Sequence, residues 1–201
     1  ISDLHERGER EREPYRRYRV LGEEWLKNLD EVRREGPIDL VCFTGDLADW
    51  GQAAEYSPAA ERLSEVLSRL EVPRERLFLV PGNHDIDRSL AQDKWEHLRQ
   101  SLPALNPLAV SRWLAGEGAP LGLDDAYRDA VLSRQAAYRD FLKHWGRADL
   151  LPGSGAHGRL GYRVTLRLVG RPFAVHLIGL DTAWLAGDDA DAGKLLLTDN
   201  Q

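Results

Sequence analysis

The chain has 201 residues, with 27 Lys and Arg against 33 Asp and Glu, so its formal charge is −6 with neutral histidines. This mildly acidic balance argues against a protein whose main activity is coating nucleic acid, because such binding depends on neutralising many phosphates. With 42% hydrophobic and 30% charged residues, the composition is typical of a folded domain and excludes disordered and collagen-like chains. The length fits one domain, or one domain with an insertion.

No apolar run approaches the roughly 18 residues needed to span a bilayer, and the first residues turn polar too early for a signal peptide. The single cysteine, Cys42, cannot form an internal disulfide, and in a strand interior we expect it to be a small buried hydrophobe. We therefore expect a cytoplasmic protein without a membrane partner. The chain lacks methionine and ends on a polar segment typical of a helix start, so we also expect further domains of a longer polypeptide.

The first part of the chain alternates helical and strand-like patterns. Apolar residues at helical spacing predict a helix over residues 15–34, and the apolar run 38–43 predicts a buried strand. The helical pattern over 53–70 and the strand-like run 77–80 repeat this order. Such a β-α-β succession predicts a parallel sheet whose faces are covered by helices.

From residue 88 to 151 the pattern is helical only, and we interpret this stretch as a helical insertion within a domain that spans 1–201. Its tryptophans and Tyr138 are expected to be core residues, with stacking on a nucleobase as the alternative. The β-rich runs 160–169 and 173–182 are separated by a short Gly-Arg-Pro turn and predict a hairpin.

Three short polar motifs follow the predicted strands. Asp3-Leu4-His5 lies where a first strand would end, Gly45-Asp46 follows the run 38–43, and Gly82-Asn83-His84-Asp85 follows the run 77–80. Because ligands of open α/β sheets bind beyond the carboxyl ends of the strands, we expect the motifs to converge on one rim. Their oxygen and imidazole groups suit divalent Mn, Fe, Zn or Ni. A carboxylate such as Asp46 can bridge two cations, and such a pair can clamp a phosphoryl displacement.

The three motifs, in this order, resemble those of the calcineurin-like metallophosphoesterases. The pattern of that family is Asp-x-His, Gly-Asp, Gly-Asn-His-Asp or Glu, an isolated histidine and a final Gly-His-x-His. Here the first three blocks read Ser2-Asp3-Leu4-His5, Thr44-Gly45-Asp46-Leu47 and Pro81-Gly82-Asn83-His84-Asp85. The segment from Gly179 to Gln201 is similar to the one that precedes the family's last blocks, so the resemblance spans nearly the whole chain outside the insertion.

The resemblance implies an α/β fold, a four-layer α/β/β/α sandwich of two mixed sheets, here truncated at its C-terminus. It also implies a dinuclear site, in which Asp3 and His5 hold one metal, Asp46 bridges both and Asn83 binds the second. His84 would touch the phosphate or protonate the leaving group, and Asp85 would orient its ring. A metal-bridging hydroxide would attack a phosphomonoester or phosphodiester without a covalent intermediate.

The family's final histidine block is missing from this chain. The remaining histidines, His97, His144, His157 and His176, do not stand in a Gly-His-x-His context. Because truncation explains this better than divergence, we expect the missing ligands beyond Gln201 and expect the 201-residue chain by itself to be inactive. The alternative is a non-catalytic phosphate- or nucleotide-binding module with a vestigial metal site.

The substrate is left open by these motifs, because nucleotides, nucleic acids, phosphoproteins and lipid head groups present the same reacting phosphate; a nuclease is a third possibility. Arginines interleaved with glutamates over residues 7–19 favour a solvated face. This segment nevertheless leaves the site directly, so one or two of its arginines could bind a substrate phosphate, with Arg16 and Arg17 as the candidates. The arginines of the segment are Arg7, Arg10, Arg12, Arg16, Arg17 and Arg19. Asp49 follows Asp46 by three residues, and we expect it either to support the ligands or to stabilise the turn, rather than to bind metal itself.

Overall fold

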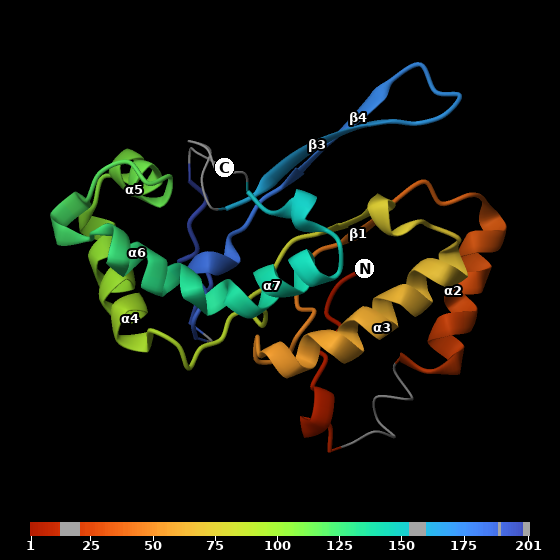
Figure 1. Ribbon diagram of the computed structural model, residues 1–201, viewed down its shortest axis with the longest axis horizontal. Helices are drawn as coiled ribbons and strands as arrows, with labels where there is room; N and C mark the ends of the chain where they lie inside the picture. The colour runs from red at the N-terminus through yellow and green to blue at the C-terminus, as the bar shows by residue number, and fades with distance from the viewer. Residues whose placement is uncertain (13–20, 153–159, 189, 199–201) are drawn as a thin grey trace.

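The computed structural model describes residues 1–12, 21–152, 160–188 and 190–198. Figure 1 shows α2 and α3 on one side of the molecule, α4 to α6 on the other, and the β3–β4 hairpin projecting from the body. The helices are α2 (Glu23–Glu35), α3 (Ala53–Leu70), α4 (Gln92–Ser101), α5 (Pro107–Leu114), α6 (Asp125–Leu132) and α7 (Ala136–His144), and the strands are β1 (Val41–Phe43), β2 (Leu77–Leu79), β3 (Tyr162–Arg167) and β4 (Ala174–Gly179). Short 3-10 helices are η1 (Gly8–Arg10), η2 (Arg74–Arg76), η3 (Leu102–Ala104), η4 (Pro120–Gly122), η5 (Ser133–Gln135), η6 (Ala148–Leu150) and η7 (Ala183–Leu185). Among the described helices, none combines the length and apolar character that crossing a membrane requires.

The predicted parallel sheet is confirmed, although its strands are shorter than the apolar runs. β1 pairs with β2 in parallel, with Val41 opposite Leu77 and Phe43 opposite Leu79. The N-terminal segment runs beside β1, since the amide of Thr44 donates to the carbonyl of Ile1 at 3.0 Å. The expectation of a buried Cys42 is wrong, because successive strand residues point to opposite faces: Val41 and Phe43 are buried and Cys42 between them is exposed.

Helices α2 and α3 share one hydrophobic core with this sheet. The core includes Leu29 of α2, Leu63 of α3, and Phe43 and Leu77 from the two strands, all buried. Burying side chains of this size stabilises the fold by about 1.5–3 kcal/mol each. The core therefore fixes the sheet, and with it the loops that leave the carboxyl ends of the strands.

The stretch 88–151 is helical as expected, but it contributes to two cores. Trp95 of α4, Trp113 of α5 and Val131 of α6 belong to a second cluster, whereas Tyr138 and Phe141 of α7 pack into the first. Trp145 joins the first cluster as well. The prediction that these aromatic residues are core residues is confirmed, since Trp95, Trp113, Tyr138 and Trp145 are all buried.

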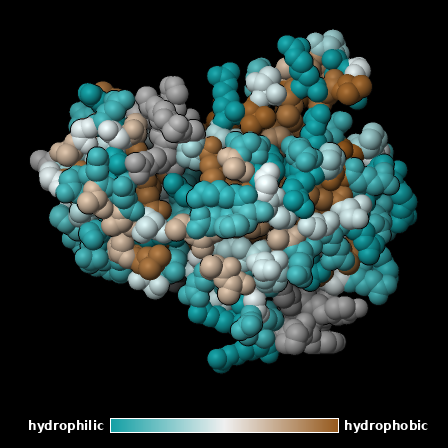
Figure 2. Space-filling view, viewed as in Figure 1, coloured by the Kyte–Doolittle hydropathy of each residue, from teal (hydrophilic) through white to brown (hydrophobic). Residues whose placement is uncertain are grey.

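The predicted hairpin is confirmed as the antiparallel pair β3–β4, with Tyr162 opposite Gly179 and Arg167 opposite Ala174. Figure 2 shows hydrophobic residues gathered over it at the upper right of the molecule. Val169, at its tip, is 99% exposed and Ile178 is 60% exposed. The chain thus has an α/β fold with one parallel and one antiparallel two-stranded sheet in its described part.

Candidate metal centre

The first two predicted motifs are joined by main-chain hydrogen bonds. The amide of Asp3 donates to the carbonyl of Gly45 at 3.0 Å, and the amide of His5 donates to the carbonyl of Asp46 at 2.9 Å. Glu6 and Ala48 continue the contact as an isolated parallel bridge. The side chains of Asp3 and His5 are therefore held beside that of Asp46, as the strand-end argument predicts.

The backbone of these residues is strained in the same way at three points. Asp3, His5 and Asp46 have φ angles of 60°, 46° and 60°, in the left-handed region that costs a non-glycine residue about 1–2 kcal/mol. Such strain persists only where the surrounding structure fixes it, and it concentrates at functional sites. Each strained residue here carries one of the candidate ligand groups.

The third motif reaches the site through a very close approach of two glycines. A Cβ atom on Gly82 would lie 2.2 Å from Oδ1 of Asp46, and one on Gly45 would lie 2.8 Å from Cα of Gly82. With no side chain in the way, the amide of His84 donates to Oδ1 of Asp46 at 2.8 Å. Glycine at both positions is therefore a steric requirement for bringing His84 to Asp46.

Asp3, His5 and Asp46 form a group that could hold a metal ion. Nε2 of His5 lies 3.7 Å from Oδ1 of Asp3 and 4.0 Å from Oδ2 of Asp46. Ligand atoms that each stand about 2.1 Å from a common ion lie roughly 3–4 Å apart, so the spacing fits one divalent cation. Two carboxylates and an imidazole are also the donors that borderline divalent metals accept.

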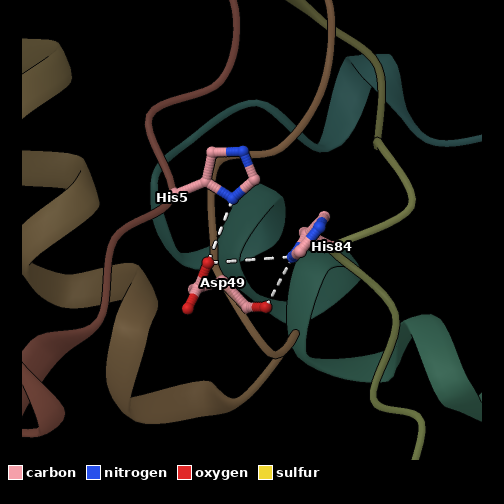
Figure 3. A group of neighbouring side chains, drawn as sticks. All are labelled: His5, Asp49 and His84. Carbon is pink, nitrogen blue, oxygen red and sulfur yellow. Dashed lines mark hydrogen bonds and ion pairs between the residues drawn. The ribbon is translucent and has the colours of Figure 1, made fainter. Parts of the chain in front are cut away.

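Asp49 lies behind this group and contacts both histidines, as Figure 3 shows. Its Oδ1 atom is 3.1 Å from Nδ1 of His5 and 3.7 Å from Nδ1 of His84. Because a carboxylate only accepts hydrogen bonds, we assign the proton of His5 to Nδ1, which leaves the Nε2 lone pair for a metal. Asp49 is only 9% exposed. The group His5, Asp49 and His84 also meets the distance criterion for a metal site.

The ring of His84 is oriented by a main-chain group. Its Nδ1 atom lies 2.8 Å from the carbonyl oxygen of Asp49, so Nδ1 carries a proton and donates it. The ring stands edge-on to that of His5, with 4.5 Å between the ring centroids. Nε2, on the other side of the imidazole, is the atom that His84 can offer to a ligand.

Asp85 does not orient His84, which corrects the expectation for this residue. The carboxylate of Asp85 is fully buried and accepts hydrogen bonds from the amides of Leu47, Ala48 and Gly82 and from the hydroxyl of Tyr56. Burial raises the pKa of Asp85 to about 6, the three amides oppose this rise, and the charge of Asp46 adds to it. Asp85 therefore ties the loop after β2 to the loop after β1.

The other predicted site residues have different positions. Asn83 is half-buried between Gly82 and His84, at the same rim. Arg16 and Arg17, like His157, lie outside the described residues. In the part of the chain that the structure describes, His97, His144 and His176 belong to neither candidate metal group.

One residue of the site, Arg7, is named in the sequence analysis only as one of six interleaved arginines. Nε of Arg7 lies 3.0 Å from Oδ2 of Asp49, on the carboxylate oxygen that the histidines do not contact. Arg7 follows His5 by two residues in a charged segment, and that pattern alone does not distinguish it from its neighbours.

The chain thus has the features of a class of α/β proteins. These proteins gather carboxylates and histidines at the ends of parallel strands, where such groups can bind divalent metal. Residues 1–178 match the family model of the calcineurin-like phosphoesterases, and the chain belongs to this family. The family acts on phosphorylated substrates and uses divalent metals.

Among curated proteins, the chain is similar to an uncharacterized metallophosphoesterase-like protein, YydB, of Bacillus subtilis (strain 168). The two are 30% identical over 73 residues, which is 36% of this chain and 15% of that protein. The match therefore covers only a small share of the relative's length.

Proposed function

We propose that this chain provides the N-terminal ligands of a dinuclear metal site that hydrolyses a phosphomonoester or phosphodiester. The observation that carries the proposal is the convergence of Asp3, His5 and Asp46, each on a strained backbone, at distances that suit one cation. Strained residues of ligand type that meet at one point favour metal binding over a structural role.

In this proposal, Asp3 and His5 would hold the first divalent ion, Asp46 would contribute to both, and Asn83 would hold the second. Bound there, the two cations lower the pKa of a water molecule and neutralise charge on the phosphate. The chain itself fixes the ligands: Asp49 holds the imidazole of His5 through Nδ1, so that Nε2 faces Asp3 and Asp46.

His84 is proposed to act on the substrate through Nε2. The carbonyl of Asp49 fixes its ring through Nδ1, and the carboxylate of Asp49 lies 3.7 Å from the same atom. A protonated Nε2 can donate a hydrogen bond to a phosphate oxygen or a proton to the leaving group.

The finer architecture is also a proposal. The parallel β1–β2 pair and the antiparallel β3–β4 pair would be parts of the two central sheets of a four-layer sandwich. Residues 1–201 would form one incomplete domain, with 88–151 as a helical insertion. In this arrangement the remaining metal ligands would lie outside residues 1–201.

Metal stoichiometry tests the proposal first. Elemental analysis of the 201-residue chain and of the longer polypeptide, both loaded with Mn²⁺, should give about two metals on the longer protein and fewer on the chain. The longer protein should release phosphate from a model ester. Absence of metal on both would overturn the proposal in favour of a binding module with a vestigial site.

The variant Asp46→Asn in the longer polypeptide tests whether Asp46 is a ligand that both metals share. We expect it to abolish turnover and to lower the metal content, because both cations lose a charged ligand. Asp39→Asn, at an exposed position before β1, is the matched control. Retained activity in Asp46→Asn would contradict the dinuclear mechanism.

A further inference from the structure

We propose that Arg7, Arg10 and Trp50 form a second anion subsite beside the metal ligands, one that selects substrates carrying a second phosphate group. This inference rests on the proposed function, since the metal centre would hold the phosphate that reacts. It concerns instead which substrate the same site prefers.

The first observation is the position of Arg7. Its Nε atom contacts Oδ2 of Asp49 at 3.0 Å, while Oδ1 of the same carboxylate contacts His5 at 3.1 Å. One carboxylate group therefore separates the guanidinium from a candidate metal ligand. The contact with Asp49 is made by Nε, and the two terminal nitrogens of an arginine side chain carry four donors.

The second observation is an exposed tryptophan between two arginines in space. The guanidinium carbons of Arg7 and Arg10 lie 5.7 Å and 5.3 Å from the ring centroid of Trp50. Trp50 directly follows Asp49 and is 41% exposed. A guanidinium that packs on an indole ring is held by cation–π attraction while its N–H groups, at the edge of its plane, can still bind an oxyanion.

The third observation is that the main chain around these side chains is fixed. Oε1 of Glu6 accepts hydrogen bonds from the amides of Arg7 and Gly8, at 3.1 Å and 3.3 Å. Oε2 of the buried Glu55 accepts from the amide of Trp50 at 3.1 Å. A fixed main chain lowers the entropy lost when a ligand is bound.

Two guanidinium groups held on a fixed main chain suit a phosphate group better than other substrate groups. The planar guanidinium fork matches two oxygens of a phosphate, and such charge-assisted bonds are about twice as strong as neutral ones. Two arginines beside the site would add affinity for a second phosphate group of the same substrate, and would add no affinity for a substrate that ends in a neutral group.

Calorimetric titration tests the inference without turnover. The Mn²⁺-loaded longer polypeptide is titrated with methylenediphosphonate, which carries two phosphonates and is not hydrolysed, and with methylphosphonate, which carries one. We expect Arg10→Gln to weaken diphosphonate binding about tenfold, as loss of one charge-assisted bond predicts, with monophosphonate binding changed less than about twofold. Arg112→Gln, an exposed arginine on α5, is the control.

A second variant keeps the test independent of any one side chain. Arg7→Lys retains the charge but loses the planar fork, and we expect it to weaken diphosphonate binding as well. If neither variant changes the ratio of the two affinities, the subsite is overturned. The proposed function is judged separately, by hydrolysis of a single-phosphate ester by the wild-type protein, so each idea can fail alone.

Discussion

Nδ1 of His5 lies 3.1 Å from Oδ1 of Asp49, and this contact turns Nε2 of the same ring towards Asp3 and Asp46. A carboxylate behind an imidazole fixes the tautomer and the orientation of the ring, and raises its basicity as a metal ligand. In the proposed site, Asp49 would act on the metal through the imidazole of His5.

The first prediction concerns the support that the carboxylate of Asp49 gives to the imidazole of His5. Asp49→Asn keeps the size of the side chain but replaces the carboxylate by a neutral amide, which holds the imidazole less firmly. We expect affinity for Mn²⁺ to fall about 10–100-fold, measured by calorimetry on the longer polypeptide. Asp39→Asn should bind metal as the wild type does, and equal affinities in all three proteins would refute the role of Asp49.

The second prediction separates His84 from the metal ligands. Because its Nδ1 atom is held by the carbonyl of Asp49, His84→Ala should lower the rate of phosphoester hydrolysis by about 100-fold or more and leave the metal content unchanged. His144→Ala, at an exposed position on α7, is the control. Loss of one metal equivalent in His84→Ala would show that His84 is a ligand instead.

The third prediction tests the close approach of the two loops. In Gly82→Ala the new Cβ atom would overlap Oδ1 of Asp46 at 2.2 Å, so one of the loops must move. We expect the free energy of unfolding to drop by about 1–3 kcal/mol, together with weaker metal binding. Urea denaturation of the metal-free chain measures the first effect.

Gly36→Ala is the matched control for this experiment. A Cβ atom at Gly36 meets nothing within 4 Å, and its φ of 167° is an extended conformation that alanine adopts. Its unfolding free energy should stay within about 0.5 kcal/mol of the wild type. A Gly82→Ala variant as stable as this control would contradict the steric argument.

The fourth prediction concerns the pH dependence of stability that the buried Asp181 causes. Asp181 is buried, accepts hydrogen bonds from Gln135 and from the amide of Trp184, and has its pKa raised to about 6 mainly by that burial. The folded chain keeps this proton to a higher pH than the unfolded chain does. The stabilising contribution is therefore complete below about pH 4 and is lost as the pH rises through 6.

Asp181→Asn removes this dependence, because an amide does not ionise. Relative to the wild type, the variant should gain about 2–3 kcal/mol of unfolding free energy between pH 4 and pH 7, measured by urea denaturation at a series of pH values. The exposed Asp140→Asn variant on α7 should follow the wild type. Parallel pH curves for Asp181→Asn and the wild type would disprove the assignment.

Some of the site could be predicted from the sequence because of the geometry of parallel strands. The runs before Asp46 and before Asn83 are short and apolar, and they form β1 and β2. The carboxyl ends of neighbouring parallel strands meet at one edge, so local pattern alone was enough to bring Asp3, His5, Asp46 and His84 together. The same reasoning failed for Cys42, because an apolar run does not show whether both faces of its strand are covered.

The sequence by itself determined the order of the elements, the parallel pairing and the set of candidate metal ligands. Strand and helix patterns are local, and a β-α-β order makes neighbouring strands parallel, with their carboxyl ends at one edge. Tertiary structure decided how those ligands are supported. Asp49 contacts His5, 44 residues away, and Asp85 contacts Leu47 and Tyr56 instead of His84. Both arrangements follow from the close packing of two loops, which the glycines at positions 45 and 82 allow. Such contacts depend on side-chain directions at sub-ångström precision, which no spacing in the sequence encodes.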